Sequence, residues 1–347
     1  MTRDIQTLSI RFVTDLLSNV VDNPRFNPEW LTLHGLTPEL LALPGARITL
    51  EEFASLYRTI AVAIDDETVG LFARPLRNGT LKYLCMLMLH APQLRVALNR
   101  FRNFMRLVND DVLFEVGPEH GGQVRIILHE RADLGATRLL ALELMLMLVQ
   151  GVASWLVARK IPFHRIAFPF AQPVHASDYE CLYPGPIRYD QGQTALHMDA
   201  AWLYEPIRQD QATLHHFLQD VPLNWFYFSD SNRPRTHLVR NFLKERLHQG
   251  PTILDVAEAL HASPRTLARH LSAEGTSFQR IKDMLRRDVA IELLNKTAQP
   301  VAAIGNSLGF EDPAAFNRAF RQWTGSAPGA YRKRPANTKL RVADTSS

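Results

Sequence analysis

The feature that most constrains this chain is a pair of short helical units near its C-terminal end, whose second helices begin in the same way. In the first unit, TILDVAEALHASPRTLARHLSAEG, Ser263 precedes Pro264. In the second unit, QPVAAIGNSLGFEDPAAFNRAFRQWTG, Asp312 precedes Pro313. A Ser or Asp oxygen caps the free N–H groups of a helix, and Pro is favoured at its first position. Each unit therefore predicts two helices joined by a tight turn, a helix-turn-helix.

Apolar spacing orients the second helix of the first unit. Leu267 and Leu271 lie four residues apart and are expected to face the core. The opposite side carries two arginines one helical turn apart, and such guanidinium groups can reach base edges or phosphates in the DNA major groove. The candidate DNA-binding residues of this unit are Arg265, Thr266, Ala268 and Arg269.

The second unit repeats this arrangement. Phe316, Phe320 and Trp323 are expected to bury its second helix, and Gly309 ends the helix before it. The side chains left outside give the second set of candidate DNA-binding residues, Ala314, Asn317, Arg318 and Arg321.

Between the units, SFQRIKDMLRRDVAIELLNKT reads as a long amphipathic helix with Phe278, Ile281, Leu285 and Leu293 inward. Such a helix is a rigid spacer. Two recognition helices held by one spacer can enter successive major grooves, roughly 34 Å apart, on one face of a DNA duplex.

Charge divides the chain in the same place. Residues 1–232 hold 20 Lys and Arg against 25 Asp and Glu, whereas residues 233–347 hold 19 against 10. The net charge of +4 thus splits into −5 and +9. The C-terminal third is the part that a polyanion would attract.

The change in charge and a run of small polar residues predict two domains. We expect an N-terminal domain over 1–228, large enough to enclose a ligand pocket, a linker of small polar residues, SDSNRPRT, over 229–236, a DNA-binding domain over 237–333 and a flexible tail over 334–347. The first domain shows helical spacing over its first 110 residues, then a hairpin between Val112 and Leu128, then short strand-like segments at 166–170, 186–189 and 195–198. The fold class is therefore an α+β N-terminal regulatory domain followed by an all-α domain with two helix-turn-helix units joined by a long helix.

One apolar segment, Leu139 to Val157, approaches the length of a membrane span. It carries Glu143, Gln150, Gly151 and Ser154, which favour a buried core helix. We therefore expect no membrane partner. The N-terminus lacks the apolar segment of a secretory signal, so we expect a cytoplasmic protein.

Motifs for catalysis, metals and cofactors are missing from the sequence. The two cysteines form no C-x-x-C pair, the 13 histidines include no H-E-x-x-H, and no phosphate-binding glycine loop or nucleophile elbow occurs. We expect no metal, no cofactor and no enzymatic activity. The carboxylates at 65–67 favour a solvated helix start over a cation site.

The paired unit resembles the DNA-binding domain of the AraC/XylS transcription regulators. The resemblance covers roughly residues 236–333, and LGFEDPAAFNRAFRQWTGSAPGAYR matches the family signature. It implies a bipartite helix-turn-helix regulator with RNA polymerase and double-stranded promoter DNA as partners. By matching positions, the base-facing and phosphate-facing roles fall on Arg265, Arg269, Ala314, Asn317 and Arg318.

The sequence departs from the family pattern at three positions. His261 stands where the family has a Gly in the turn, a position of positive φ that His tolerates better than most residues. Gly305 replaces a preferred Ala and is expected to weaken its helix by ~1 kcal/mol. Ala314 cannot hydrogen-bond a base, which reduces specificity in the second unit.

The N-terminal part is similar to the arabinose-binding-domain-like region of ornithine-utilisation and related regulators. The segment HRIAFPFAQPVHASDYECLYPGPIRYDQGQTALHMDAAWLYEPI carries this resemblance, with weaker likeness back to about Pro28. It implies an unidentified small-molecule effector and a homodimer. The motif residues Phe168, Tyr179, Pro186 and Tyr189 fit a core as well as they fit a ligand site.

The sequence thus predicts a sequence-specific DNA-binding regulator that is controlled by an effector bound to the N-terminal domain. An activator is favoured over a repressor. Two alternatives stay open. One is an enzyme whose C-terminal module tethers it to nucleic acid, although no nucleophile and base pair stands out in residues 1–232. The other is a non-specific architectural DNA-binding protein.

Overall fold

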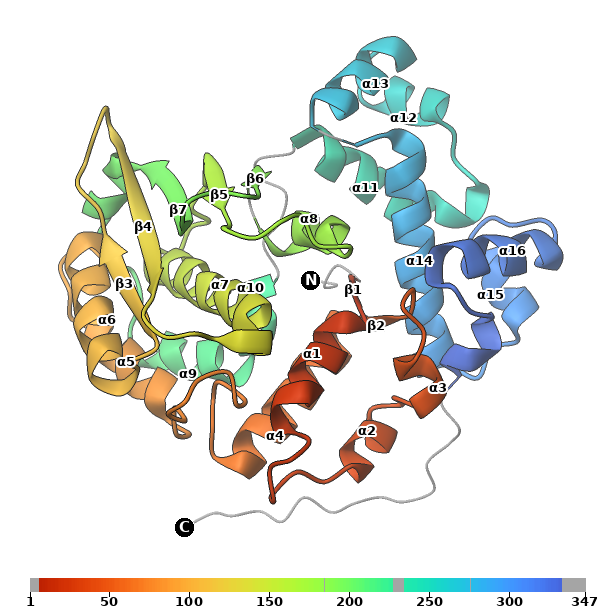
Figure 1. Ribbon diagram of the computed structural model, residues 1–347. Helices are drawn as coiled ribbons and strands as arrows, with labels where there is room; N and C mark the ends of the chain where they lie inside the picture. The colour runs from red at the N-terminus through yellow and green to blue at the C-terminus, as the bar shows by residue number, and fades with distance from the viewer. Residues whose placement is uncertain (1–5, 184, 227–233, 275, 333–347) are drawn as a thin grey trace.

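The computed structural model describes residues 6–183, 185–226, 234–274 and 276–332. A sheet with its covering helices forms one side of the molecule, and helices α11 to α16 form the other (Figure 1). The N-terminal strand β1, Thr7–Ser9, and strand β2, Arg47–Thr49, pair antiparallel and lie between the two sides. This small sheet, which the sequence did not predict, is therefore at the boundary of the two domains.

The main sheet has five strands in the order β3-β4-β7-β5-β6. Strands β3 and β4 form the predicted hairpin, with Val116 opposite Ile126, and all neighbours in the sheet are antiparallel except β5 and β6. The strands are β3 Val112–Val116, β4 Gln123–Glu130, β5 Arg165–Ala167, β6 Ile187–Arg188 and β7 Thr194–Asp199. The expected strand segments are thus present, and the N-terminal domain is α+β as predicted.

Helices surround this sheet and fill the rest of the N-terminal domain. They are α1 Arg11–Val20, α2 Glu29–Leu33, α3 Pro38–Leu41, α4 Leu50–Ile64, α5 Thr80–Leu89, α6 Leu94–Val108, α7 Arg138–Leu156, α8 Tyr179–Leu182, α9 Gln211–Gln219 and α10 Leu223–Phe226, with 3-10 turns η1 Gly135–Thr137, η2 Ala176–Asp178 and η3 Ala200–Tyr204. Helix α4 begins at a complete capping box, in which Thr49 accepts from the Glu52 amide and the Glu52 carboxylate accepts in return.

Helix α7 is the centre of this domain. Sixteen of its nineteen residues are buried, and it contacts α1, α6, α10 and β7. The segment Gly135–Leu156 is long and apolar enough to cross a membrane, but 89% of its most apolar window is buried inside the protein. The prediction of a buried core helix is confirmed, and burial on all sides explains why its apolar residues follow no single stripe.

Three adjacent carboxylates at the end of α4 correct one expectation. Asp66 and Glu67 do not begin a helix in solvent, because Asp66 is only 4% exposed and accepts hydrogen bonds from the amides of Thr68, Gly70 and Leu76. The Glu67 carboxylate accepts from the amides of Gly79 and Leu81. Through these hydrogen bonds, both side chains stabilise the conformation of the segment between α4 and α5. No His, Cys, Asp and Glu cluster suited to a metal occurs among the residues that the structure describes.

The C-terminal domain is all-helical, as predicted. Its elements are α11 Pro234–Arg246, η4 Leu247–Gln249, α12 Ile253–Ala259, α13 Pro264–Ala273, α14 Phe278–Lys296, α15 Val301–Ser307, α16 Pro313–Thr324 and η5 Pro328–Tyr331. Helix α11 begins at Pro234, so residues 234–236 of the expected linker are helical. Residues 229–233 of that linker and the expected tail, 334–347, lie outside the described residues.

A buried carboxylate on α7 yields a pH-dependent prediction. Burial raises the pKa of Glu143 to about 7, against its ordinary 4.5, although a hydrogen bond with His175 and the charge of that ring act in the opposite direction. The Tyr179 hydroxyl donates to the same carboxylate, and Asp15 and Asp178 also act on it. Because the folded protein holds this proton more tightly than the unfolded chain, the contribution of Glu143 to stability is fully present below pH 4.5 and is lost as the pH rises to about 7.

Glu143→Gln removes this ionisation and keeps an acceptor for Tyr179. We expect the variant to equal the wild type near pH 5 and to exceed it at pH 8 by about 3 kcal/mol in unfolding free energy. Urea unfolding at the two pH values measures this difference. Glu115→Gln, at a half-exposed pair with His129, is the control and should change little at either pH. Parallel pH profiles of wild type and Glu143→Gln would contradict the assignment.

Candidate nucleic-acid interface

The first helix-turn-helix unit has the local geometry that its sequence predicts. Ser263 is the N-cap of α13, and its Oγ accepts a hydrogen bond of 3.1 Å from the Thr266 amide. Pro264 occupies the first helical turn, while Leu267 and Leu271 are buried. The turn before α13 places His261 at φ 50°, as its match to a family glycine predicts. The cap and the turn together fix the direction in which α13 leaves α12.

The outer face of α13 carries the candidate residues. Arg265, Ala268 and Arg269 are exposed, so both guanidinium groups are accessible from solvent. Thr266 is half-buried, and its hydroxyl accepts a hydrogen bond of 2.9 Å from Ser263. Thr266 therefore contributes to the cap of this helix.

The second unit has the same design. Asp312 caps α16, accepting hydrogen bonds from the Ala314 and Ala315 amides at 2.9 and 3.1 Å. Gly309 ends the preceding turn at φ 75°, and a Cβ there would lie 2.7 Å from the Leu247 carbonyl oxygen. Only glycine satisfies both conditions without strain.

Gly305 shows why this unit departs from the family pattern. A Cβ at this position would meet the Cβ and Cγ of Phe316 at 3.1 Å. Phe316 is fully buried, and the absence of a side chain at Gly305 allows α15 and α16 to approach closely. The glycine that lowers helix propensity therefore has a packing role that propensity alone does not reveal.

The outer face of α16 is only partly free for a ligand. Ala314, Arg318 and Arg321 are exposed, whereas Asn317 is half-buried and its Nδ2 donates to the Pro313 carbonyl at 2.8 Å. The Arg318 guanidinium lies 3.7 Å from the Asp312 carboxylate, and both side chains are mostly exposed. This surface pair is weak, so Arg318 can exchange it for a phosphate or a base.

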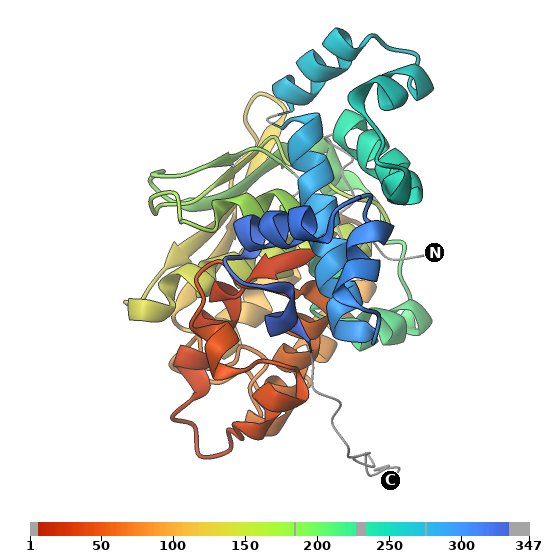
Figure 2. The same ribbon diagram turned by 90° about the vertical axis from the view of Figure 1, so that its right-hand side faces the viewer.

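Helix α14 connects the two units unequally. Helices α15 and α16 contact α14 directly, whereas α12 and α13 pack against α11, which in turn lies along α14. Figures 1 and 2 show α14 between the two units, with α12 and α13 near its first residues. The predicted spacer is present, but the first unit is held through α11.

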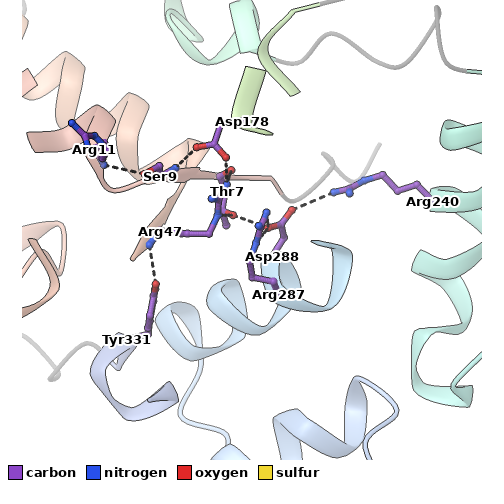
Figure 3. A network of polar contacts seen from close by, with 9 residues as sticks. All are labelled: Thr7, Ser9, Arg11, Arg47, Asp178, Arg240, Arg287, Asp288 and Tyr331. Atoms are coloured by element: carbon purple, nitrogen blue, oxygen red, sulfur yellow. Dashed lines mark hydrogen bonds and ion pairs between the residues drawn. The ribbon is translucent and has the colours of Figure 1, made fainter. Parts of the chain in front are cut away.

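A buried polar cluster joins this assembly to the N-terminal domain (Figure 3). Thr7 of β1 donates to Asp288 of α14 at 2.6 Å, and Arg47 of β2 donates to Thr7 through its Nε at 2.8 Å. The Arg47 guanidinium also contacts Asp178 at 2.5 Å. Thr7, Arg47, Asp178 and Asp288 are each less than 10% exposed. We call these residues, with Arg240, Arg287 and Tyr331, the interdomain cluster.

The remaining members of the interdomain cluster come from the C-terminal domain. Arg287 of α14 and Arg240 of α11 contact the Asp288 carboxylate at 2.9 and 3.6 Å. The Tyr331 hydroxyl accepts a hydrogen bond of 2.8 Å from the Arg47 amide. Burial lowers the pKa of Arg287, an effect that the nearby Asp288 counteracts. Asp288 is thus the carboxylate on which α11, α14 and β1 converge.

A second contact links the ends of two long helices. Lys296, the last residue of α14, lies 2.6 Å from the Glu51 carboxylate in the first turn of α4. Asn295 donates to the Glu52 carboxylate at 3.1 Å. Nearby, a Cβ on Gly45 would lie 2.9 Å from the carbonyl oxygen of Thr324 in α16. The two domains therefore contact each other through α14, the end of α16 and η5, away from the outer faces of α13 and α16.

Sequence reasoning missed every member of the interdomain cluster. Its polar residues are separated by up to 284 positions, as are Arg47 and Tyr331, and no local pattern relates them. The one available signal was Asp288, a carboxylate in line with the apolar residues Ile281 and Leu285 on one face of the spacer helix.

The two domains and the two helix-turn-helix units define a two-domain helix-turn-helix regulator. Comparison with known proteins agrees with this class. Residues 28–207 match the family model "Arabinose-binding domain of AraC transcription regulator, N-term", and residues 256–334 match "Helix-turn-helix domain". The chain belongs to the AraC family of transcription regulators. It has a ligand-binding N-terminal domain and a DNA-binding C-terminal domain.

Similar proteins include three regulators of Pseudomonas aeruginosa. The Ornithine utilization regulator of Pseudomonas aeruginosa is 27% identical over 86% of this chain and 88% of its own length. The regulator VqsM of the same species is 36% identical over 26% of this chain and 28% of its own length. The crystal structure of the regulator CdpR, also from Pseudomonas aeruginosa, aligns over 93% of this chain and 97% of its own, at 19% identity and a TM-score of 0.34.

The interdomain cluster gives a stability prediction. Asp288→Asn removes the carboxylate that Arg240 and Arg287 share, and leaves buried positive charge without its partner. We expect unfolding free energy to fall by about 3 kcal/mol, as when one member of a buried ion pair is removed. Urea unfolding measures the loss. Asp283→Asn, on the same helix but hydrogen-bonded at the surface to Gln279, should cost less than about 0.5 kcal/mol. Equal losses in the two variants would show that the interdomain cluster does not hold the domains.

Proposed function

We propose that this regulator binds promoter DNA by placing α13 and α16 in successive major grooves on one face of the duplex. The observation that carries the proposal is that both capped recognition helices expose arginines from the part of the chain whose net charge is +9. Their spacing depends on α14, against which α16 packs directly and α13 packs through α11.

The exposed side chains have distinct proposed roles. Arg265 and Arg269 lie one turn apart on α13 and contact guanine or flanking phosphates. On α16, Arg318 and Arg321 supply the positive charge, and the methyl group of Ala314 suits contact with a thymine methyl.

Two other candidates have more restricted roles. Asn317 can read a base only after its Nδ2 leaves the Pro313 carbonyl. Thr266 is already engaged with Ser263, so its proposed contribution is to hold the N-terminus of α13 against the DNA backbone. The first unit therefore supplies most of the sequence discrimination.

The wider assignment rests on family membership and on the arrangement of domains. We propose a cytoplasmic regulator, without enzymatic turnover, that binds an effector in residues 1–228, forms a homodimer and recruits RNA polymerase as an activator. The interdomain cluster supports control by the effector, because it connects the ligand-binding domain directly to α14 and, through Asp288, to α11. Allosteric control requires that the effector bind more tightly in one arrangement of these helices than in another.

Single arginine replacements test the DNA-binding surface. We expect Arg269→Ala and Arg318→Ala each to weaken specific binding by ~1–3 kcal/mol, the contribution of a good base contact, without loss of folding. Titration of a footprinted genomic fragment with each variant measures this. The control is Arg77→Ala, an 81% exposed arginine of the N-terminal domain, which removes the same charge far from α13 and α16. Wild-type affinity in both test variants would refute the assignment.

Salt dependence separates specific recognition from general attraction. Each phosphate that the protein neutralises releases counterions, so the logarithm of the binding constant should fall linearly with the logarithm of salt concentration, by about 0.9 per contact. Arg265→Ala should make this slope shallower by about 1 if Arg265 meets a phosphate, and should leave it nearly unchanged if Arg265 reads a base. A complex insensitive to salt would contradict the proposed interface.

A further inference from the structure

A buried lysine on the spacer helix binds the backbone of the first helix-turn-helix unit. Lys282 of α14 is 9% exposed, and its Nζ donates to the carbonyl oxygens of Gly250 and Pro251 at 3.2 and 2.7 Å. Gly250 is the C-cap of η4, and Pro251 precedes Thr252, the N-cap of α12. In addition to the packing of α12 and α13 on α11, Lys282 therefore holds the segment from which the first unit begins.

An arginine one helical turn further along α14 binds the second unit in the same way. The Arg286 guanidinium donates to the carbonyl oxygens of Leu308 and Gly309 at 2.9 and 3.1 Å, and it lies 4.5 Å from the centre of the Phe310 ring. These three residues form the turn between α15 and α16, which leads to Asp312, the N-cap of the second recognition helix. Arg286 therefore fixes the point from which α16 begins.

Both cations are satisfied by carbonyl oxygens, and neither forms an ion pair with a carboxylate among the residues that the structure describes. Burial lowers the pKa of Lys282 and of Arg286, and at Lys282 the charge of Arg286 adds to this effect. Apolar side chains at such positions often stabilise a protein as well as buried charges do. Hydrogen bonds to particular carbonyl oxygens add direction, which non-directional apolar packing lacks.

The two segments that these cations hold also lie against each other. A Cβ on Gly309 would lie 2.7 Å from the carbonyl oxygen of Leu247 and 3.1 Å from the amide nitrogen of Gly250. Leu247 begins η4, and Gly250 is its C-cap. The turn of the second unit is therefore adjacent to the segment that leads into the first unit, and Lys282 and Arg286 act on the same junction between the two units.

We propose that Lys282 and Arg286 are positioning residues for DNA recognition, which together set the orientation of α13 relative to α16. Apolar packing holds the first unit on α11 and the second on α14, while the four carbonyl contacts fix where each unit lies along and around α14. Their donor groups face protein carbonyls, so this role needs no contact with DNA. The proposal rests on the proposed binding of DNA by α13 and α16, and it adds the residues that determine which spacing of the two DNA segments is read.

The dependence of binding on that spacing is a readout that a loss of stability alone would not change. The probe is the genomic fragment that the full chain protects, with derivatives that carry one or two extra base pairs between the two protected segments. One base pair rotates the second segment by about 35° and moves it by about 3.4 Å. We therefore expect the wild type to bind each derivative at least about tenfold more weakly than the original fragment.

Lys282→Met and Arg286→Met keep the length of the side chain and remove its donors. Each variant should bind the original fragment about tenfold more weakly than the wild type, and one extra base pair should then weaken binding by less than about threefold. Affinity for a fragment with only one protected segment should stay within about threefold of the wild type, because each recognition helix keeps its own side chains. Lys296→Met is the matched control. It removes a cation that meets Glu51 and Glu292 at the end of the same helix, and it should keep the wild-type dependence on spacing.

Three results would overturn the proposal: a wild-type dependence on spacing in the folded methionine variants, an equal loss of that dependence in Lys296→Met, or equal losses of affinity for the single segment and for the pair. Arg286→Lys keeps the charge but not the planar fork of donors, and its dependence on spacing should be intermediate. This mild replacement keeps the test decisive if both methionine variants fail to fold, because an unchanged dependence on spacing in Arg286→Lys would then refute the proposal.

Footprinting of the wild type separates this proposal from the proposed function. A wild type that protects two adjacent segments, with variants that keep its dependence on spacing, refutes the positioning role alone. A wild type that protects no paired segments refutes the proposed mode of DNA binding itself.

Discussion

The contact between Asp288 and the groups around it determines how the two halves of this protein are assembled. Asp288 is 1% exposed, and it meets Thr7 of the N-terminal strand and arginines of α11 and α14. Desolvating such charges costs several kcal/mol per ion, which their mutual attraction offsets only when the geometry is good. The main effect of such a cluster is therefore to favour one arrangement of the two domains, and its net contribution to the free energy of unfolding is smaller. Its members meet only when β1, α11 and α14 lie as they do here.

Two long helices extend this arrangement to the ends of the molecule. Helix α4 is capped by Thr49, the last residue of β2, and its capping carboxylate Glu52 also accepts from Asn295 of α14. Breaking that contact would release one partner of the capping box, so the start of α4 and the end of α14 stabilise each other. Since α4 continues from this point into the core of the N-terminal domain, one continuous helix connects the ligand-binding domain to the end of the spacer helix.

The sequence predicted the parts of this protein that depend on short-range chemistry. The caps at Ser263 and Asp312 follow from residues close together in the chain, and the positive φ of His261 follows from its match to a family glycine. The structure confirms all three. The small sheet of β1 and β2 and the interdomain cluster did not follow, because no local pattern relates their partners, which are 42 positions apart at Thr7 and Thr49 and 284 apart at Arg47 and Tyr331. Gly305 lies between these cases, since its helix was predictable but its close approach to Phe316 needed the packed structure. The proposed DNA-contacting residues were identified from helix faces.

The geometry also limits how an effector could control DNA binding. Six of the eight candidate residues are exposed while the domains are in contact, so the N-terminal domain does not cover the recognition helices. An effector therefore does not control DNA binding by covering or uncovering α13 and α16.

Arg240 belongs to α11, which carries the first unit, whereas Asp288 belongs to α14, which carries the second. Because one carboxylate joins both carriers, a displacement at the interdomain cluster changes the orientation of one recognition helix relative to the other. Two helices that read successive grooves are sensitive to that orientation, since a small rotation misplaces one of them on the duplex.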